Sequence, residues 1–213
     1  MNKIIIKILY FILLCIHISC NTSKSVLPEA TSLNEHREKY KAGFLNDPRS
    51  PLTKDYLTYL DFYEENPSWK LQCQCELQKD AKPFELPTYS GITRTYILHS
   101  IATCKYQKES IVLFLYKNIT QPINPLYKNN LFLPFKDHTN GEESYGGGRY
   151  INLYTTDIVK DKLEIDFNKC YNPWCAYSDG YNCPIPPKEN HLEREVRAGE
   201  KKYQGAYKKK EVK

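Results

Sequence analysis

The sequence predicts a mainly β fold with some helix (α+β), in which an antiparallel meander forms a barrel or a strongly curved sheet. Short runs of alternating, β-branched and aromatic residues recur from Trp69 to Phe167, and turn-forming residues separate them. The 18 tyrosines also favour strands over a leucine-rich helical bundle. No repeat or change of composition divides the chain, so we expect one domain over residues 32–205, with one or two N-terminal helices and a long Pro-rich C-terminal loop.

The first nineteen residues have the pattern of a secretion signal. Lys3 and Lys7 precede an apolar run over residues 8–18. A permanently inserted helix is the alternative, but it needs about 20 apolar residues. This run is shorter and is interrupted by His17. We therefore interpret residues 1–19 as a cleaved signal peptide.

The next residues resemble the bacterial lipobox, in which a small residue precedes a cysteine whose thiol is acylated. Ser19 and Cys20 match this pattern, whereas His17 stands where it prefers Leu or Val. We expect cleavage before Cys20, a lipid anchor on its thiol, and a flexible tether over residues 20–31. Asn21 follows the cysteine, at the position where an aspartate would signal inner-membrane retention. Its presence favours an outer-membrane lipoprotein facing the periplasm.

The net charge argues against nucleic acid as a partner. It is +5 for the whole chain, and the loss of Lys3 and Lys7 lowers it to +3, which is too mild for such a role. Much of the excess lies near the C-terminus, where residues 206–213 form a basic tail that we interpret as solvated. No motif implies a cofactor, and the sequence does not identify a protein partner.

Two helices are expected before the strands. Ser32 and Glu35 form an S-x-x-E capping box at the start of the first helix, which ends before Asn46. A second, short helix is expected with Ser50 as its N-cap and Pro51 in its first turn. Packing against a sheet accounts for the apolar face of each helix.

The first strand has the clearest pattern. Apolar and polar residues alternate from Trp69 to Gln78, as they do in a strand with one buried face. A hairpin and three further strands are expected at residues 95–106, 111–116, 131–135, 149–154 and 162–167. A polar turn over residues 155–161 joins the last two strands.

Six cysteines follow Cys20, and none has the CxxC or Cys/His spacing of a zinc site, so we expect no metal. Cys73 and Cys75 share the inward face of the first strand, where we interpret them as small apolar core residues. The pairing of these two residues, and of Cys104 and Cys170, stays open at this point.

Residues 171–190 have little periodicity but many prolines. Such a segment is either a lid or site wall, or a stiffened loop that covers an open sheet edge. Cys175 and Cys183 bracket the turn-prone Ser178-Asp179-Gly180. Because we expect an oxidising compartment, we predict a disulfide between these two cysteines.

Three segments resemble the family catalogued as domain of unknown function 1684. They are LFLPFKDHTNGEESYGGGRYINL at residues 131–153, DFNKCYNPWCAYSDGYNCPIPPKEN at 166–190 and RAGEK at 197–201. The resemblance extends over residues 34–203, more loosely in the N-terminal half. It implies a shared fold but no established reaction. Cys170 replaces a small alanine of the family pattern, so we interpret it as a buried small residue.

Polar side chains of these segments form the candidate site. We expect a cleft between the strand ends and the Pro-rich loop that binds a polar or anionic small molecule. The expected lining residues are Arg149, Tyr145, Asp137, Asn168, Asn172 and Tyr177. Arg149 would supply a fixed positive charge and would be held from behind by Asp166. In the alternative reading, these side chains satisfy one another in a structural network.

Two other functions stay open. A hydrolase, possibly acting on a saccharide, could take its acid and base from Asp137, Asp166 or Glu200. An unpaired carboxylate facing the cleft would favour this enzyme. Nucleophilic catalysis by Cys175 would need a histidine base, and no motif links one to it. The remaining alternative is a structural envelope protein.

Overall fold

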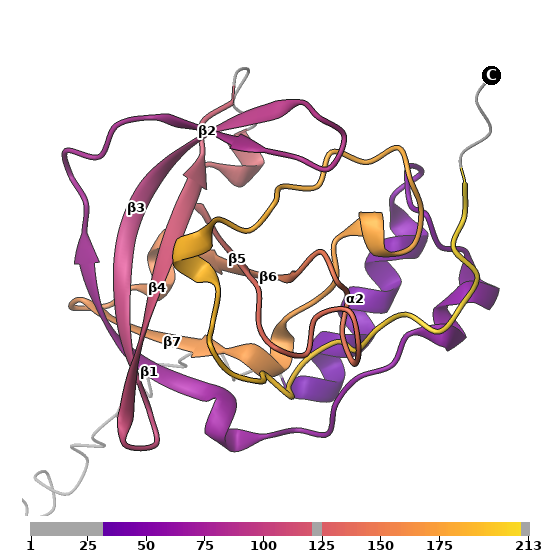
Figure 1. The fold of residues 1–213 in the computed structure, drawn as a ribbon, viewed down its shortest axis with the longest axis horizontal. Helices are drawn as coiled ribbons and strands as arrows, with labels where there is room; N and C mark the ends of the chain where they lie inside the picture. The colour runs from indigo at the N-terminus through magenta and orange to yellow at the C-terminus, as the bar shows by residue number, and fades with distance from the viewer. Residues whose placement is uncertain (1–31, 121–124, 210–213) are drawn as a thin grey trace, which may run out of the picture. The chain divides into compact units, whose positions relative to one another are not determined.

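The computed structural model describes residues 32–120 and 125–209 (Figure 1). The described residues from Ser32 onward belong to one compact unit. The expected signal peptide, the lipid-bearing Cys20 and the whole tether lie outside the described residues. None of the helices within the described ranges has the length and apolar character needed to span a membrane.

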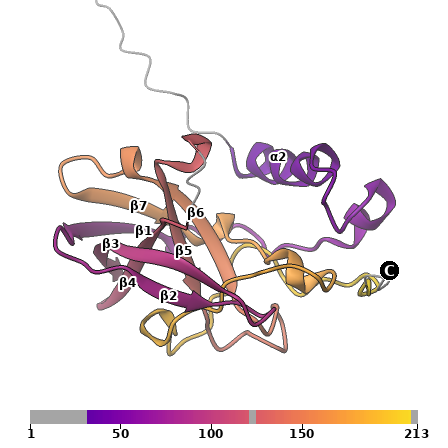
Figure 2. The same ribbon diagram turned by 90° about the horizontal axis from the view of Figure 1, so that it is seen from above.

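The helix α2 (Leu33–Asn46) begins as the sequence predicts. Ser32 is its N-cap, and the Ser32 hydroxyl accepts a hydrogen bond from the Glu35 amide at 3.2 Å. Phe44 is the buried residue of this helix. Both ribbon views place α2 beside the sheet and next to the C-terminal third of the chain (Figures 1 and 2).

The second predicted helix does not form at Ser50. The Ser50 hydroxyl accepts from the Leu52 amide at 3.1 Å and donates to the Leu52 carbonyl at 2.9 Å. This local turn competes with a helical first turn. A short 3-10 helix at Lys54–Tyr59 follows instead.

Seven strands of the described residues form one antiparallel sheet that curls into a half-barrel, so the predicted fold class is confirmed (Figures 1 and 2). The strands are β1 (Lys70–Leu77), β2 (Phe84–Pro87), β3 (Thr93–Tyr106), β4 (Glu109–Asn118), β5 (Asn130–Phe135), β6 (Arg149–Tyr154) and β7 (Lys162–Asp166). Further short 3-10 helices lie before, between and after the strands, at Pro67–Trp69, Pro125–Tyr127, Thr155–Asp157, Phe167–Lys169, Trp174–Ala176 and Lys188–Asn190.

The strand order determines which strand ends meet. The sheet runs β6-β5-β4-β3-β1-β7, and β2 pairs with β3. The predicted hairpin is confirmed as β3–β4. β6 and β7 are consecutive in sequence, but they lie at opposite ends of this order. β2 was not predicted, because Pro83 and Pro87 mark its segment as a loop. The first residues of β3 pair with β2, and its later residues pair with β1.

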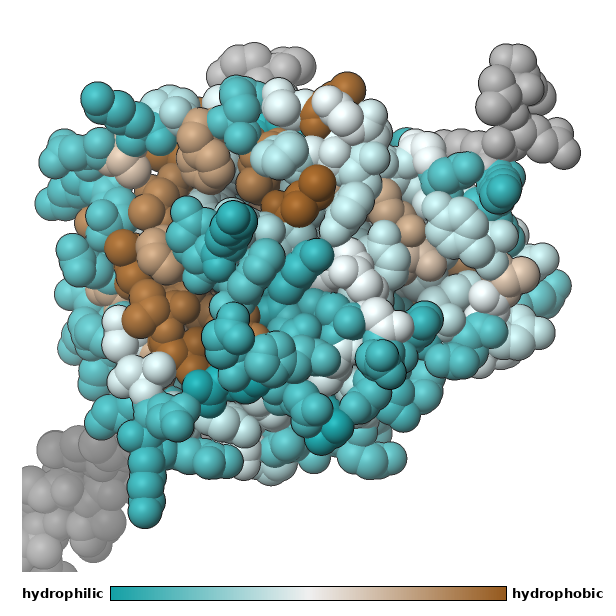
Figure 3. Space-filling model, in the orientation of Figure 1, coloured by the Kyte–Doolittle hydropathy of each residue, from teal (hydrophilic) through white to brown (hydrophobic). Residues whose placement is uncertain are grey.

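The main core lies between the inner face of the sheet and the C-terminal segment. β1 alternates exposed and buried residues as predicted, with Leu71 and Cys73 turned inward. Leu192, Val196 and Ala198 of the C-terminal segment complete this core, which fits the yellow ribbon crossing the sheet in Figure 1. The face drawn in Figure 3 is mostly hydrophilic, with apolar residues gathered at the surface over the strands on the left.

Two disulfides are present among the described residues. Cys175 and Cys183 are bonded, as the sequence predicts. The interpretation of Cys73 as a plain core residue is wrong, because the pairing of β1 with β3 places it directly opposite Cys104, and the two are bonded. Cys75 and Cys170 are buried free thiols.

Candidate functional site

Arg149 lies in the protein interior and not at a cleft wall. Its side chain is fully enclosed, and Nη2 donates to Asp137 Oδ2 at 2.8 Å. Nη1 donates to the Ala198 carbonyl and Nη2 to the Val196 carbonyl, each at 2.7 Å. The ion pair therefore attaches the start of β6 to the C-terminal segment. The predicted pairing of Arg149 with Asp166 is wrong.

Asp137 is satisfied within the same network. Its Oδ1 accepts from the Thr139 hydroxyl at 2.6 Å, the Thr139 amide at 2.9 Å and the Val196 amide at 3.1 Å. Fixed donors and an arginine partner surround this carboxyl group, whose side chain has no solvent-exposed surface. This arrangement suits a structural role for Asp137.

Asp166 lies far from Arg149 in the sheet order because β7 pairs with β1. Its Oδ1 accepts from the Asn168 amide at 3.0 Å and from the Asn168 side chain at 2.9 Å. Asn168 in turn donates to the Asn66 carbonyl at 3.0 Å and accepts from the Asn66 amide at 2.8 Å. The Nζ atoms of Lys70 and Lys169 lie 4.0 and 3.8 Å from Asp166 Oδ2. Hydrogen bonds from Asp166 through Asn168 thus hold the loop at Asn66 in place.

Glu200 is fully buried among hydrogen-bond donors. Its carboxyl oxygens lie 2.6 Å from the Tyr177 hydroxyl and 2.8 Å from the Tyr40 hydroxyl, and Oε2 accepts from the Asn172 amide at 2.9 Å. The Asn172 side chain donates to the Lys201 carbonyl at 2.7 Å. Burial raises the pKa of Glu200 to about 7, against the opposing effect of these donors.

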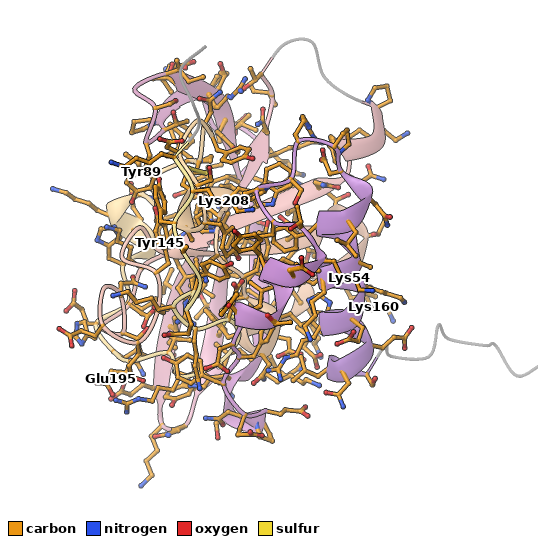
Figure 4. All side chains as sticks on the ribbon, turned by 90° about the vertical axis from the view of Figure 1, so that its right-hand side faces the viewer. Lys54, Tyr89, Tyr145, Lys160, Glu195 and Lys208 are labelled. Atoms are coloured by element: carbon orange, nitrogen blue, oxygen red, sulfur yellow. A yellow bond between two sulfur atoms is a disulfide. The ribbon has the colours of Figure 1, made fainter. Side chains whose placement is uncertain are left out.

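Tyr145 is the one predicted lining residue that is only half-buried. Burial raises the pKa of its hydroxyl to about 12. Figure 4 shows Tyr145 and Tyr89 on the side of the molecule away from α2. The Tyr89 hydroxyl donates to the Gly147 carbonyl at 2.9 Å, and the Tyr145 ring covers the position that a Gly147 side chain would take. The structure therefore brings Arg149 and Asp137 together, and Asn172 and Tyr177 together, but not all six residues.

An open cleft lies next to these networks. It has a volume of about 530 Å³ and is formed by the Pro-rich segment, β6, the start of β3 and the loop after α2. We call it the aromatic cleft. Its lining residues are Arg49, Arg94, Tyr150, Tyr171, Pro173, Trp174, Gly180, Tyr181, Asn182, Cys183 and Pro184.

Sequence neighbours of the predicted residues line the aromatic cleft. Tyr150 follows Arg149 on β6, and successive strand side chains point to opposite faces. Tyr171 precedes Asn172, and its amide and carbonyl exchange hydrogen bonds of 3.0 and 2.9 Å with those of Tyr150. The Tyr150 hydroxyl donates to the Pro184 carbonyl. The Pro-rich segment also covers the end of β2, where the Ile185 amide donates to the Pro87 carbonyl at 2.9 Å.

Two arginines supply the charge of the aromatic cleft, and sequence reasoning missed both. Arg94 is half-buried, and its side chain makes no hydrogen bond or ion pair with any described residue. Arg49 is exposed, pairs with Asp47 at 2.7 Å, and lies 5.9 Å from the centre of the Trp174 ring. Among the described residues no Asp or Glu lines the cleft. Both arginines lie outside the three family-like segments, so no motif could identify them.

Comparisons with known proteins agree with the resemblance seen in the sequence. No curated protein matches the chain. A solution NMR structure of an uncharacterized protein from Haloarcula marismortui is 29% identical, with a TM-score of 0.62, and the alignment covers 79% of this chain and 91% of that one. Residues 55–201 match the family described as protein of unknown function (DUF1684). The chain therefore belongs to the DUF1684 family.

Proposed function

We propose that the protein binds an anionic small molecule with a planar or apolar body in the aromatic cleft. The observation that carries this proposal is Arg94, a half-buried residue whose side chain has no hydrogen-bond or ion-pair partner among the described residues, in a cleft that no described carboxylate lines. Desolvating a charge without a partner is unfavourable, so a bound anion would compensate for the cost. An arginine fork suits carboxylate or phosphate groups.

The remaining lining residues suit the body of such a ligand. Trp174 and Tyr181 lie edge to face with their ring centres 5.1 Å apart, and Tyr150 and Tyr171 do so at 6.0 Å. Aromatic faces of this kind pack against planar groups or the apolar face of a sugar ring. The Cys175–Cys183 disulfide fixes the segment that carries Trp174 and Tyr181, which reduces the entropy lost on binding.

The carboxylates give less support to a hydrolase. Asp137 is paired with Arg149, and Asp166 is bound by Asn168. Glu200 lacks a cationic partner among the described residues but is fully buried and does not line the aromatic cleft. An acid and base pair needs contact with substrate, and none of the three provides it in this cleft. Binding is therefore the function that we propose.

We also propose that the protein is exported and anchored to a membrane by lipid on Cys20, most simply in the outer membrane with the domain in the periplasm. The support is the order of basic residues, apolar run, Ser19 and Cys20. Two disulfides in the domain fit an oxidising compartment.

Thermal unfolding of the full chain tests ligand binding. The probes are aromatic carboxylates, uronic acids and organic monophosphates, and each carboxylic acid is paired with its neutral amide. A ligand at a hundred times its Kd stabilises the folded state by about 2.7 kcal/mol, which raises Tm by roughly 5 to 10 °C in a chain of this size. We expect this rise for at least one acid and not for its amide. Equal effects of acid and amide, or no effect of any probe, would contradict the proposal.

A further inference from the structure

Three oxygen-bearing side chains from distant parts of the chain form a closed ring. Glu200 Oε2 lies 2.8 Å from the Tyr40 hydroxyl, the Tyr40 and Tyr177 hydroxyls lie 2.9 Å apart, and Tyr177 lies 2.6 Å from Glu200 Oε1. Each of these distances is that of a hydrogen bond. Tyr40 belongs to α2, Tyr177 follows the 3-10 helix Trp174–Ala176, and Glu200 belongs to the C-terminal segment.

Counting protons decides the charge of Glu200. The ring has three oxygen–oxygen contacts, and two tyrosine hydroxyls provide only two protons. If the carboxylate is ionised, one contact has no hydrogen, and two buried oxygens face each other unbonded. If the carboxyl is protonated, its own O–H fills the third contact.

One direction around the ring also satisfies the backbone. The carboxyl O–H at Oε1 donates to Tyr177, the Tyr177 hydroxyl donates to Tyr40, and the Tyr40 hydroxyl donates to Oε2. Oε2 then accepts from the Asn172 amide as well, at 2.9 Å. Every donor around the carboxyl group has an acceptor in this arrangement.

The surroundings do not compensate a negative charge on Glu200. The groups facing it are Tyr40 from α2, Tyr177 and Asn172 from the Pro-rich segment, and the thiol of Cys170. No Lys or Arg of the described residues forms an ion pair with its carboxylate, and Arg149 Nη1 reaches only its main-chain carbonyl, at 3.2 Å. Burial in this setting raises the pKa of Glu200 to about 7.

We infer that Glu200, Tyr40 and Tyr177 form a proton-dependent latch that is closed while Glu200 is neutral and weakened when it ionises. The latch attaches both α2 and the Trp174–Tyr177 turn to the C-terminal segment. The Tyr177 amide donates to the Trp174 carbonyl at 3.0 Å, so ionisation also loosens one wall of the aromatic cleft. The latch itself does not depend on whether the cleft binds a ligand.

The sign of the pH effect follows from the raised pKa. Glu200 titrates near 7 when folded and near its ordinary value of 4.5 when unfolded. Its contribution to stability is therefore complete below about pH 4.5 and is lost as the pH rises to about 7. Above that range both states are ionised, and no further change comes from this group.

Carbon-13 NMR of the glutamate carboxyl groups in the full wild-type chain is the direct test. We expect one carboxyl resonance with a titration midpoint near pH 7, whereas ordinary glutamates titrate near about 4.3. Glu200→Gln should remove that resonance. If every glutamate carboxyl titrates below pH 5.5, Glu200 is ionised at neutral pH and the latch is excluded.

Melting temperature and hydrogen exchange test the consequence. Relative to Glu200→Gln, the Tm of the wild type should fall as the pH rises from 4.5 to 7 and then stay level, while Glu142→Gln at the surface should follow the wild type. In the wild type, the Tyr177 amide should exchange at least several-fold faster at pH 8 than at pH 6 after correction for intrinsic rates. Unchanged protection would show that ionisation does not open the latch.

Discussion

Arg149 and Asp137 form an ion pair with no solvent-exposed side-chain surface, Nη2 lying 2.8 Å from Oδ2. The two residues lie on either side of the glycine-rich turn between β5 and β6. Three carbonyl groups of residues 196–200 accept hydrogen bonds from the same guanidinium. The family-like segments 131–153 and 197–201 are therefore joined by this guanidinium, which explains why Arg149 and Asp137 belong to the fold and not to the cleft.

Removing Arg149 should destabilise the protein strongly. Arg149→Ala leaves the Asp137 carboxyl group buried without its partner, and breaking a buried pair costs about 3 to 5 kcal/mol. Arg197→Ala, which removes a half-exposed partner of Glu143, should cost at most about 1 kcal/mol. Urea unfolding measures both changes. Similar small losses in the two variants would show that the buried pair does not hold the C-terminal segment.

Both disulfides should be present in the isolated protein. In the chain-entropy relation, loops of 31 and 8 residues correspond to about 3.7 and about 2.5 kcal/mol. Replacing Cys73 and Cys104 together with Ala should therefore destabilise more than replacing Cys175 and Cys183 together. Peptide mapping without reductant should find each pair linked. Alkylation of all four thiols in the unreduced protein would refute both bonds.

Two glycines should respond to Ala in opposite directions. Gly43 lies within α2, and no atom of the described residues lies within 4 Å of the position that a Cβ would take, so Gly43→Ala should stabilise the protein by about 0.5 to 1 kcal/mol. Gly148 has a φ of +90°, and a Cβ there would lie 2.6 Å from the Phe135 carbonyl oxygen. Gly148→Ala should cost about 2 kcal/mol or more. Chemical unfolding that ranks the two variants in the reverse order would contradict this account of the turn before Arg149.

Lipid anchoring should depend on Cys20 alone. Cys20→Ser removes the acylated thiol and should move the protein from the membrane pellet to the soluble periplasmic fraction. Cys15→Ser, inside the expected signal peptide, is the matched control and should leave the protein in the pellet. Cell fractionation followed by immunoblotting measures both. Retention of the Cys20→Ser protein in the membrane would rule out the anchor.

Local sequence patterns predicted most of the fold. The alternation in β1, the capping box of α2, the β3–β4 hairpin and the Cys175–Cys183 bond each depend on residues close together in the chain. The Arg149–Asp137 pair and the Cys73–Cys104 bond do not. Both depend on strand order and register, and the adjacent placement expected for β6 and β7 gave Arg149 the wrong partner.

The candidate site was predicted in its segment but not in its side chains. Tyr150 and Tyr171 are sequence neighbours of the expected Arg149 and Asn172, yet they line the aromatic cleft while the expected residues are enclosed. Gly148, which has a positive φ, directly precedes β6. The sequence does not show which side chains of β6 then point into the core and which point into the cleft. Arg94 lies at the start of β3. The sequence does not show that this end of β3 lies beside the Pro-rich segment, because the two are far apart in the chain.

We propose that Arg94 holds an anion in the aromatic cleft. Calorimetric titration of the anion that most raises Tm, into the wild type, Arg94→Gln and Lys105→Gln, tests this role of Arg94. Lys105 lies exposed on the same strand and does not line the cleft. A hydrogen bond to a charged group contributes about 1.5 to 3 kcal/mol, so Arg94→Gln should bind at least about tenfold more weakly, and Lys105→Gln should bind as the wild type does. Equal affinity of Arg94→Gln and the wild type would contradict the claim.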